Sequence, residues 1–155
     1  MLVERVIFKA VERLKVSIYI KSNFRGNPKG AGEAAAIIEF ISGSGNTHYR
    51  QHRVKIENDT KNALILKICI HTLRSLLKPC EAVIFTNCDY VKNAFNMNWL
   101  EKWKQDGWKR ATGKPPANVE GWKQLYMLTQ IHKVQFELYG GKYDMELDNL
   151  LKESD

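Results

Sequence analysis

The sequence has few of the features that assign a chain to a specialised class of protein. Its first residues contain no uninterrupted apolar run, because charged side chains divide them at Arg5, Lys9, Glu12 and Arg13. We therefore expect neither a signal peptide nor a membrane span. No internal repeat, phosphate-binding loop, dinucleotide fingerprint or nucleophile elbow is visible. These absences argue against a membrane protein and against the enzyme classes that those motifs define.

Cysteine and proline are also scarce. The three cysteines, Cys69, Cys80 and Cys88, are odd in number and lack the spacing of metal ligands. This pattern favours reduced thiols in the cytoplasm over a disulfide framework. Four prolines and ten glycines in 155 residues, with 44% apolar residues, are ordinary for a globular chain. We expect a single cytoplasmic domain over residues 1–155, with a real hydrophobic core.

Positive charge is in excess. Lysine and arginine number 24 against 17 acidic residues, which gives a formal net charge of +7. This balance favours a polyanionic partner, although an inert basic surface has the same composition.

Apolar spacing and turn residues predict an α/β fold, called α+β in some schemes. Residues 1–13 form an extension that fits either a short strand or an amphipathic turn of helix. Strands are expected at 16–20, 34–41, 47–56, 82–86 and 134–139. Helices are expected from the capping residues 58–60 to about 77, through the basic stretch that follows the fourth strand, across 121–130 and over 144–152. The order β-β-β-α-β-α-α-α-β-α indicates a mixed five-stranded sheet with helices on its faces.

All four tryptophans lie in the basic stretch 99–122. Trp99 and Trp103 are four residues apart and so share one face of a helix. Gly107 should end that helix, and Asn118 can cap the next one. The basic residues of this stretch are Lys102, Lys104, Lys109, Arg110 and Lys114. They indicate either a phosphate-binding ridge on aromatic supports or a solvated helix pair with an aromatic core.

This stretch resembles the basic handle of type-1 ribonuclease H, in the pattern W-x3-W-K-x2-G-W-K…K-P-x2-N-V-x2-W. We call residues 96–122 the handle. Three shorter segments also resemble that family: the G-N-P turn at 26–28, F-T-N-C-D-Y-V at 85–91 and L-D-N-L at 147–150. The resemblance extends from about residue 16 to residue 151. It implies a ribonuclease H-like fold and a site for two Mg²⁺ ions held by four carboxylates.

The positions that match those carboxylates hold Lys21, Ala63, Asn87 and Asp148, with Asn62 an alternative to Ala63. The family's histidine-bearing loop corresponds to residues 140–143, which contain no histidine. One carboxylate beside an ammonium lacks the negative charge that two divalent ions require. We therefore expect no functional catalytic residue, no bound metal and no cofactor. Mg²⁺ would be needed only if nearby acids rebuilt the site, and the candidates are Glu57, Asp59, Asp89, Asp144 and Glu146.

Lys21 leads to a specific hypothesis. The fold implied by the resemblance places its ammonium near the metal position, within reach of Asp148. We expect an ion pair that replaces the metal site and adds positive charge for holding a phosphate. The alternative is that Lys21 extends to solvent while Asp148 caps or solvates the last helix.

The histidines carry less information. A zinc pair formed by His48 and His52, four residues apart in a predicted strand, is a weak alternative to two solvated side chains. His71 and His132 are expected to be ordinary surface or half-buried residues.

Binding is the function that the sequence favours. The resemblance implies that Asn27 and the region of Asn58 approach the minor groove of an RNA–DNA hybrid, and that Thr60 or its neighbours lie near a phosphate. Polar contacts to 2′-hydroxyls distinguish RNA from DNA. The handle would hold the DNA backbone through its basic residues, with Trp103 and Trp108 supporting the ridge rather than stacking on sugars. We expect a monomer that binds a hybrid or another duplex without cleaving it. The alternatives are a protein-interaction scaffold, which would have a protein partner, and a weakly active hybrid ribonuclease.

Overall fold

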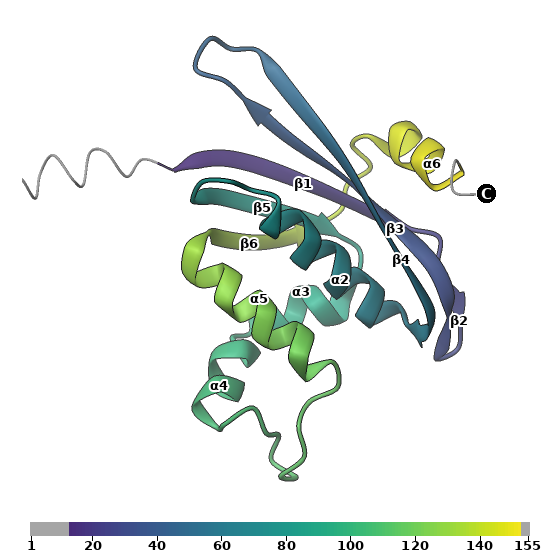
Figure 1. Ribbon diagram of the computed structural model, residues 1–155, viewed down its shortest axis with the longest axis vertical. Coiled ribbons are helices and arrows are strands. Elements are labelled where there is room, and N and C mark those ends of the chain that lie inside the picture. The colour runs from purple at the N-terminus through teal and green to yellow at the C-terminus, as the bar shows by residue number, and fades with distance from the viewer. Residues whose placement is uncertain (1–12, 153–155) are drawn as a thin grey trace, which may run out of the picture.

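The computed structural model describes residues 13–152, and the predicted extension 1–13 falls outside it except for Arg13. A mixed sheet forms the centre, with α2, α3 and α5 on one face and α6 on the other (Figure 1). The strands are β1 (Leu14–Ser22), β2 (Arg25–Gly26), β3 (Lys29–Ile41), β4 (Thr47–Thr60), β5 (Cys80–Thr86) and β6 (Lys133–Leu138). The helices are α2 (Lys61–Arg74), α3 (Asp89–Asn96), α4 (Trp99–Gln105), α5 (Val119–Ile131) and α6 (Asp144–Lys152).

The long strands lie in the order β4-β3-β1-β5-β6. β3 pairs antiparallel with β1 and β4, whereas β1, β5 and β6 run parallel. In the β1–β5 register Tyr19 lies opposite Phe85. Continuing that register by two residues brings Lys21 to the same edge of the sheet as Asn87. The carboxyl ends of these two central strands therefore define one location for the functional site.

Alternation along the strands separates two hydrophobic clusters. Ile18 and Ile20 of β1 contribute to the larger cluster, together with the buried residues of α2 and with Trp122 of α5. Tyr19, between them, points to the other face and belongs to the cluster with Leu147 of α6. Because both faces of β1 are covered, the end of this strand is held firmly from two sides.

The predicted order of elements is confirmed, with one addition. The sheet contains a sixth, two-residue strand, β2, which pairs with Gly30 and Ala31 at the start of β3. The hairpin depends on Gly30, because a Cβ there would lie 1.8 Å from the carbonyl oxygen of Arg25. This close pairing also explains why β3 begins at Lys29 rather than at residue 34, as the apolar pattern suggested.

Helix boundaries differ from expectation in two places. Helix α2 ends at Arg74 rather than near residue 77. Directly after Arg74, the Ser75 hydroxyl donates to the carbonyl of Thr72, and the exposed Leu77 offers no apolar contact that would extend the helix. The predicted side-chain cap by Asn118 is wrong. Asn118 precedes α5 in the left-handed conformation (φ +61°) and makes no capping hydrogen bond. A short polar side chain tolerates that conformation, and this explains the residue type.

The three cysteines are free, as predicted, and all three are buried. His132 is not a surface or half-buried residue: it is 2% exposed, and its Nδ1 accepts the backbone N–H of Cys80 at 3.0 Å. Within residues 13–152 no helix combines the length and apolarity needed to span a bilayer.

Candidate nucleic-acid interface and the altered catalytic position

We call the four positions that the resemblance matches to the family's carboxylates the altered position. They lie near the end of β1, directly after β5, in the first turn of α2 and in α6. Lys21 is near the end of β1, and Asn87 follows β5 directly. Ala63 is in the first turn of α2, where its N–H donates to the capping hydroxyl of Thr60 at 3.1 Å. The start of α2 and the end of β5 are in contact, because the Cys88 Sγ lies 3.3 Å from Asn62 Oδ1.

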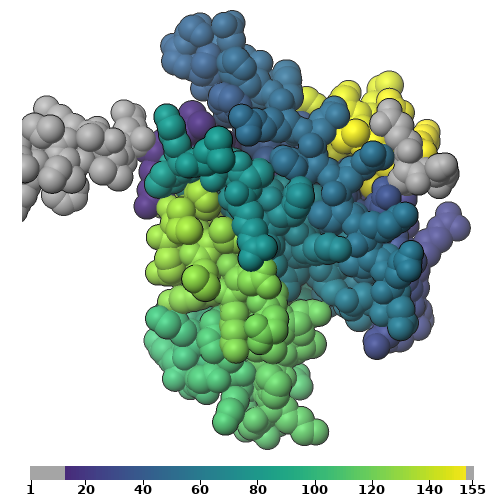
Figure 2. Space-filling model, in the orientation of Figure 1, coloured from purple at the N-terminus to yellow at the C-terminus, as the bar shows by residue number. Residues whose placement is uncertain are grey.

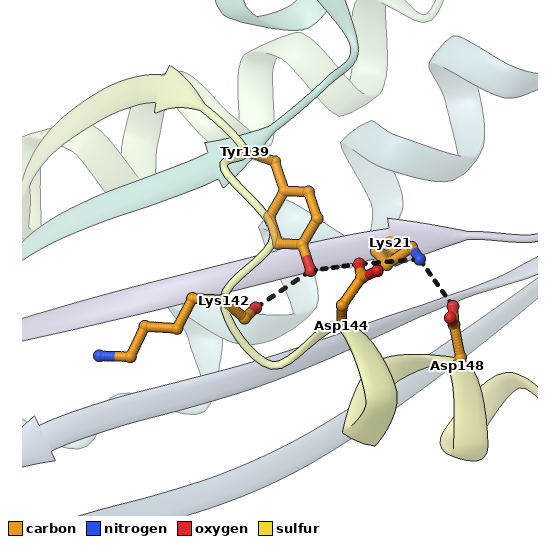
Figure 3. Close-up of polar contacts among 5 residues, drawn as sticks. All are labelled: Lys21, Tyr139, Lys142, Asp144 and Asp148. Atoms are coloured by element: carbon orange, nitrogen blue, oxygen red, sulfur yellow. Dashed lines mark hydrogen bonds and ion pairs between the residues drawn. The ribbon is translucent and has the colours of Figure 1, made fainter.

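The Lys21 ammonium contacts two carboxylates of α6 (Figure 3). Its Nζ lies 2.7 Å from Asp148 Oδ1 and 2.9 Å from Asp144 Oδ1. The predicted contact with Asp148 is thus present, and Asp144 is a partner that the sequence hypothesis missed. Asp144 and Asp148 are four residues apart in one helix, so both side chains face the strand. That spacing was the sequence signal for the second carboxylate.

A tyrosine completes this group of side chains. The Tyr139 hydroxyl lies 2.9 Å from Asp144 Oδ1 and 3.0 Å from the carbonyl oxygen of Lys142, both of them acceptors. Hydrogen bonds from Lys21 and then from Tyr139 lower the pKa of Asp144. We call Lys21, Tyr139, Asp144 and Asp148 the Lys21 network.

The Lys21 network changes the expected electrostatics of the site. One ammonium and two carboxylates give a net charge of −1 at neutral pH, and hydrogen bonds from Lys21 to Asp148 and Asp144 raise the pKa of the ammonium. The expectation that Lys21 adds positive charge for a phosphate is therefore wrong, because both carboxylates neutralise it. The network instead connects α6 to the end of β1.

Lys21→Met should lower the free energy of unfolding by about 1–2 kcal/mol at neutral pH. This is less than a fully buried pair would contribute, because the side chains of Lys21, Asp144 and Asp148 are 24%, 53% and 46% exposed. Chemical denaturation of Lys21→Met, Asp148→Asn and the double variant measures the coupling. Additive losses would contradict the pairing. Lys123→Met, which breaks a 3.6 Å surface pair with Glu120, is the matched control and should have the smaller effect.

The loss of stability in Lys21→Met should depend on pH in a defined way. The raised pKa of Lys21 means that its contribution is complete below the unfolded value of 10.5 and is lost as pH rises through the folded value. The lowered pKa of Asp144 means that its contribution is present above 3.8 and is lost as pH falls through the folded value. The Lys21→Met penalty should therefore be constant between about pH 5 and pH 9 and shrink outside that range.

The loop before α6 is held against the sheet by contacts of its Lys142 and Tyr143 side chains. Lys142 Nζ lies 3.0 Å from Glu39 Oε2 on β3, and Tyr143 also contacts that carboxylate. The ammonium of Lys142 lies over the rings of Tyr19 and Tyr143, at 5.5 and 5.3 Å. These contacts hold the segment 140–143, which the resemblance matches to the family's histidine-bearing loop.

The donor atoms at this position do not fit the two Mg²⁺ ions that the resemblance implies. Mg²⁺ requires oxygen ligands in octahedral geometry. Lys21 carries a cation, Ala63 has no donor, and the Asn87 amide is neutral. Asp148 is the remaining carboxylate of the four, and it is already paired with Lys21. Across residues 13–152, no three His, Cys, Asp or Glu side chains come together as a metal site.

The handle projects away from the sheet at the end of the molecule opposite the β3–β4 hairpin (Figures 1 and 2). Its loop is ordered by backbone hydrogen bonds: Arg110 N–H donates to the Lys114 carbonyl at 2.7 Å, and Gly113 N–H to the Arg110 carbonyl at 2.8 Å. The five predicted cations, Lys102, Lys104, Lys109, Arg110 and Lys114, are all exposed. Several exposed cations in one projecting segment are suited to the regular charges of a phosphate backbone.

The tryptophans of the handle pack on other aromatic rings, which is the arrangement that a supporting role predicts. Trp103 is half-buried, with ring centroids 6.1 Å from Trp99 and 5.6 Å from the fully buried Trp122. Trp108 packs edge-on against Tyr126 at 5.9 Å. Both rings contact the larger hydrophobic cluster, so the handle and the sheet share one core.

The residues expected near a minor groove or a phosphate lie around the start of α2. Asn27 is exposed beside β2, and Asn58 is exposed with a left-handed backbone (φ +50°). Thr60 is half-buried and uses its hydroxyl to cap α2. Asn27 and Asn58 are therefore free to contact a ligand through their side chains, whereas the Thr60 hydroxyl is already engaged.

These features define the class of the molecule as a ribonuclease H-like fold. The structure superimposes on LC9-RNase H1, a type 1 RNase H with the type 2 active-site motif, with a TM-score of 0.77. The two are 21% identical, over 93% of this chain and 73% of that one. The foamy viral protease–reverse transcriptase solved with an RNA/DNA hybrid matches with a TM-score of 0.62 at 15% identity, over 89% of this chain and 19% of that one.

Sequence comparison defines the family. Residues 13–142 match the RNase H family. Ribonuclease H of Lachnoclostridium phytofermentans is 37% identical over 123 residues, which cover 79% of this chain and 78% of that protein. The chain belongs to the ribonuclease H family.

Proposed function

We infer that this protein binds an RNA–DNA hybrid or another nucleic-acid duplex and does not hydrolyse it. The observation that carries this proposal is the position of the Lys21 ammonium, 2.7 Å from Asp148 and 2.9 Å from Asp144. An internal cation takes the place where the resemblance expects a metal ligand. The chain keeps the fold and the basic handle while its altered position presents one family carboxylate instead of four.

Two features support binding. The handle offers five exposed cations on a framework fixed by tryptophan packing, and contacts to phosphates would be independent of base sequence. Asn27 and Asn58 are exposed polar residues that could reach 2′-hydroxyls in a minor groove. The foamy viral relative of this fold is solved with RNA/DNA hybrid, which supports the hybrid as the first ligand to test.

The second candidate is a working hybrid ribonuclease with a rebuilt metal site. The Lachnoclostridium relative is a ribonuclease H, which favours cleavage, and Asp144 adds a carboxylate next to Asp148. Against this candidate, both carboxylates are bound to Lys21, and a metal site tolerates only small displacements of its ligands. A protein-interaction scaffold is the third candidate, and it would show no salt-sensitive affinity for nucleic acid.

Electrophoretic mobility shift with labelled hybrid, double-stranded RNA and double-stranded DNA tests the proposal. We expect the hybrid to shift at the same protein concentration in EDTA and in Mg²⁺, because no metal ion links the protein to its phosphates. We also expect the labelled strand to remain intact in Mg²⁺ and in Mn²⁺ at high protein concentration.

Two results would contradict the proposal in different ways. Cleavage that Asp148→Asn abolishes would establish the ribonuclease candidate. Absence of a shift at low salt with all three duplexes would leave the scaffold candidate.

A further inference from the structure

A histidine pair lies apart from both the handle and the Lys21 network. His52 of β4 and His71 of α2 approach each other across the strand–helix interface, with His52 Nδ1 3.1 Å from His71 Nε2. The two rings are steeply inclined, at 71°, with centroids 5.0 Å apart. His48, which the sequence placed with His52, instead stacks on Phe40 and does not take part.

We propose that His52 and His71 chelate one divalent transition-metal ion, such as Zn²⁺ or Ni²⁺. Imidazole nitrogens bind zinc at about 2.0–2.1 Å, so two of them on one ion lie about 3 Å apart at the usual angles. The observed 3.1 Å matches that separation. A hydrogen bond, in which one ring donates its N–H and the nitrogen of the other ring accepts it, fits the same distance and is the alternative that the experiment below distinguishes.

The second ring nitrogen of His52, Nε2, is consistent with ligation through Nδ1. His52 Nε2 is buried and has no hydrogen-bond partner among the described residues, so Nδ1 is the atom through which this ring makes its polar contact. Ligation through Nδ1 fixes the proton on Nε2. Binding would join β4 directly to α2.

The surroundings determine which ion the pair would take. Both histidines line a groove of about 840 Å³ between β4, α2 and α5, which leaves room for water in the other coordination positions. Lys67 and Arg74 line the same groove, and their charges limit the affinity for any cation. Imidazole favours Zn²⁺, Ni²⁺ and Cu²⁺, whereas Mg²⁺ prefers oxygen. The site is thus distinct in chemistry from the family's magnesium site.

Metal titration of chelator-treated, tag-free protein tests the proposal. We expect Zn²⁺ and Ni²⁺, but not Mg²⁺, to raise the melting temperature of the wild type. Isothermal titration should show binding at least about tenfold weaker in His52→Gln and in His71→Gln, because each variant removes one of two ligands. His48→Gln is the matched control and should bind as the wild type does.

The proposal is overturned if Zn²⁺ and Ni²⁺ leave the wild type unchanged, or if His71→Gln responds to them as the wild type does. His71 is exposed on α2, so its replacement should leave the fold intact and can decide the question alone if His52→Gln does not fold. Either contrary result would identify the pair as a hydrogen bond only.

Discussion

Restoring the missing carboxylates should convert this protein into a magnesium-dependent hybrid ribonuclease. The variant Lys21→Asp/Ala63→Glu/Asn87→Asp joins three new acids to Asp148, which Lys21 no longer neutralises. Several negative ligands together can offset the repulsion between two divalent ions. We expect cleavage of a labelled hybrid in Mg²⁺ at least about a thousandfold faster than by the wild type, the scale on which one preorganised catalytic group acts.

A variant with neutral side chains separates the effect of the added carboxylates on cleavage from the effect of side-chain shape. Lys21→Asn/Ala63→Gln keeps Asn87 and has similar side-chain volumes but no added carboxylate, so it should remain inactive. Adding Asp148→Asn to the restored variant should abolish the gained cleavage. Wild-type cleavage at a rate comparable to that of the restored variant would refute the ligand-counting argument, and an inactive but folded restored variant would refute the assignment of the four positions.

The site could be predicted in part because its altered residues are single positions in recognisable segments. Lys21 and Asp148 were expected to pair, and their side chains do so at 2.7 Å. Asp144 and Tyr139 were not expected to join them, because Asp144 had been considered only as a possible rescue ligand. Their roles depend on how the loop 140–143 turns into α6, which involves Gly141 at φ +98° and Tyr143 at φ +66°. Apolar spacing contains no information about such a turn.

The same contrast holds for the rest of the fold. The alternating strand β1 and the helix Asp144–Lys152 followed from apolar periodicity, which reports burial on one face. The hairpin strand β2 did not, because its two residues are exposed and pair only through their backbone. The His52–His71 contact was also missed, since residues 19 apart in sequence meet only through the packing of α2 on β4.

From the charge distribution we expect binding at the handle rather than at the altered position. The Lys21 network has a net charge of −1, so it offers no attraction for a phosphate. The handle carries five exposed cations, and its acids are few. One of these, Glu101, accepts a hydrogen bond from the Tyr126 hydroxyl at 3.3 Å, and Lys104 lies 5.1 Å over the ring of Tyr126. The handle should therefore account for most of the salt dependence of binding.

Affinity for the hybrid should fall steeply with salt, and neutralising the handle should remove most of that dependence. If four to six phosphates are contacted, log K should fall with log salt at a slope of roughly −4 to −5, since each contact contributes about −0.9. Raising salt from about 50 to about 200 mM would then weaken binding by a factor of a few hundred to a thousand. Replacing Lys102, Lys104, Lys109 and Lys114 by alanine should reduce the slope by up to about 3.6.

The control variant for this measurement replaces four exposed lysines outside the handle, Lys15, Lys78, Lys133 and Lys152, and so removes the same net charge. If binding depended on net charge alone, both variants would lose the same slope. Fluorescence anisotropy over a salt series distinguishes the cases, with melting temperatures to confirm that each variant is folded. An unchanged slope in the handle variant would show that the phosphates are bound elsewhere. A slope reduced only in the handle variant would establish the handle as the surface that holds the duplex.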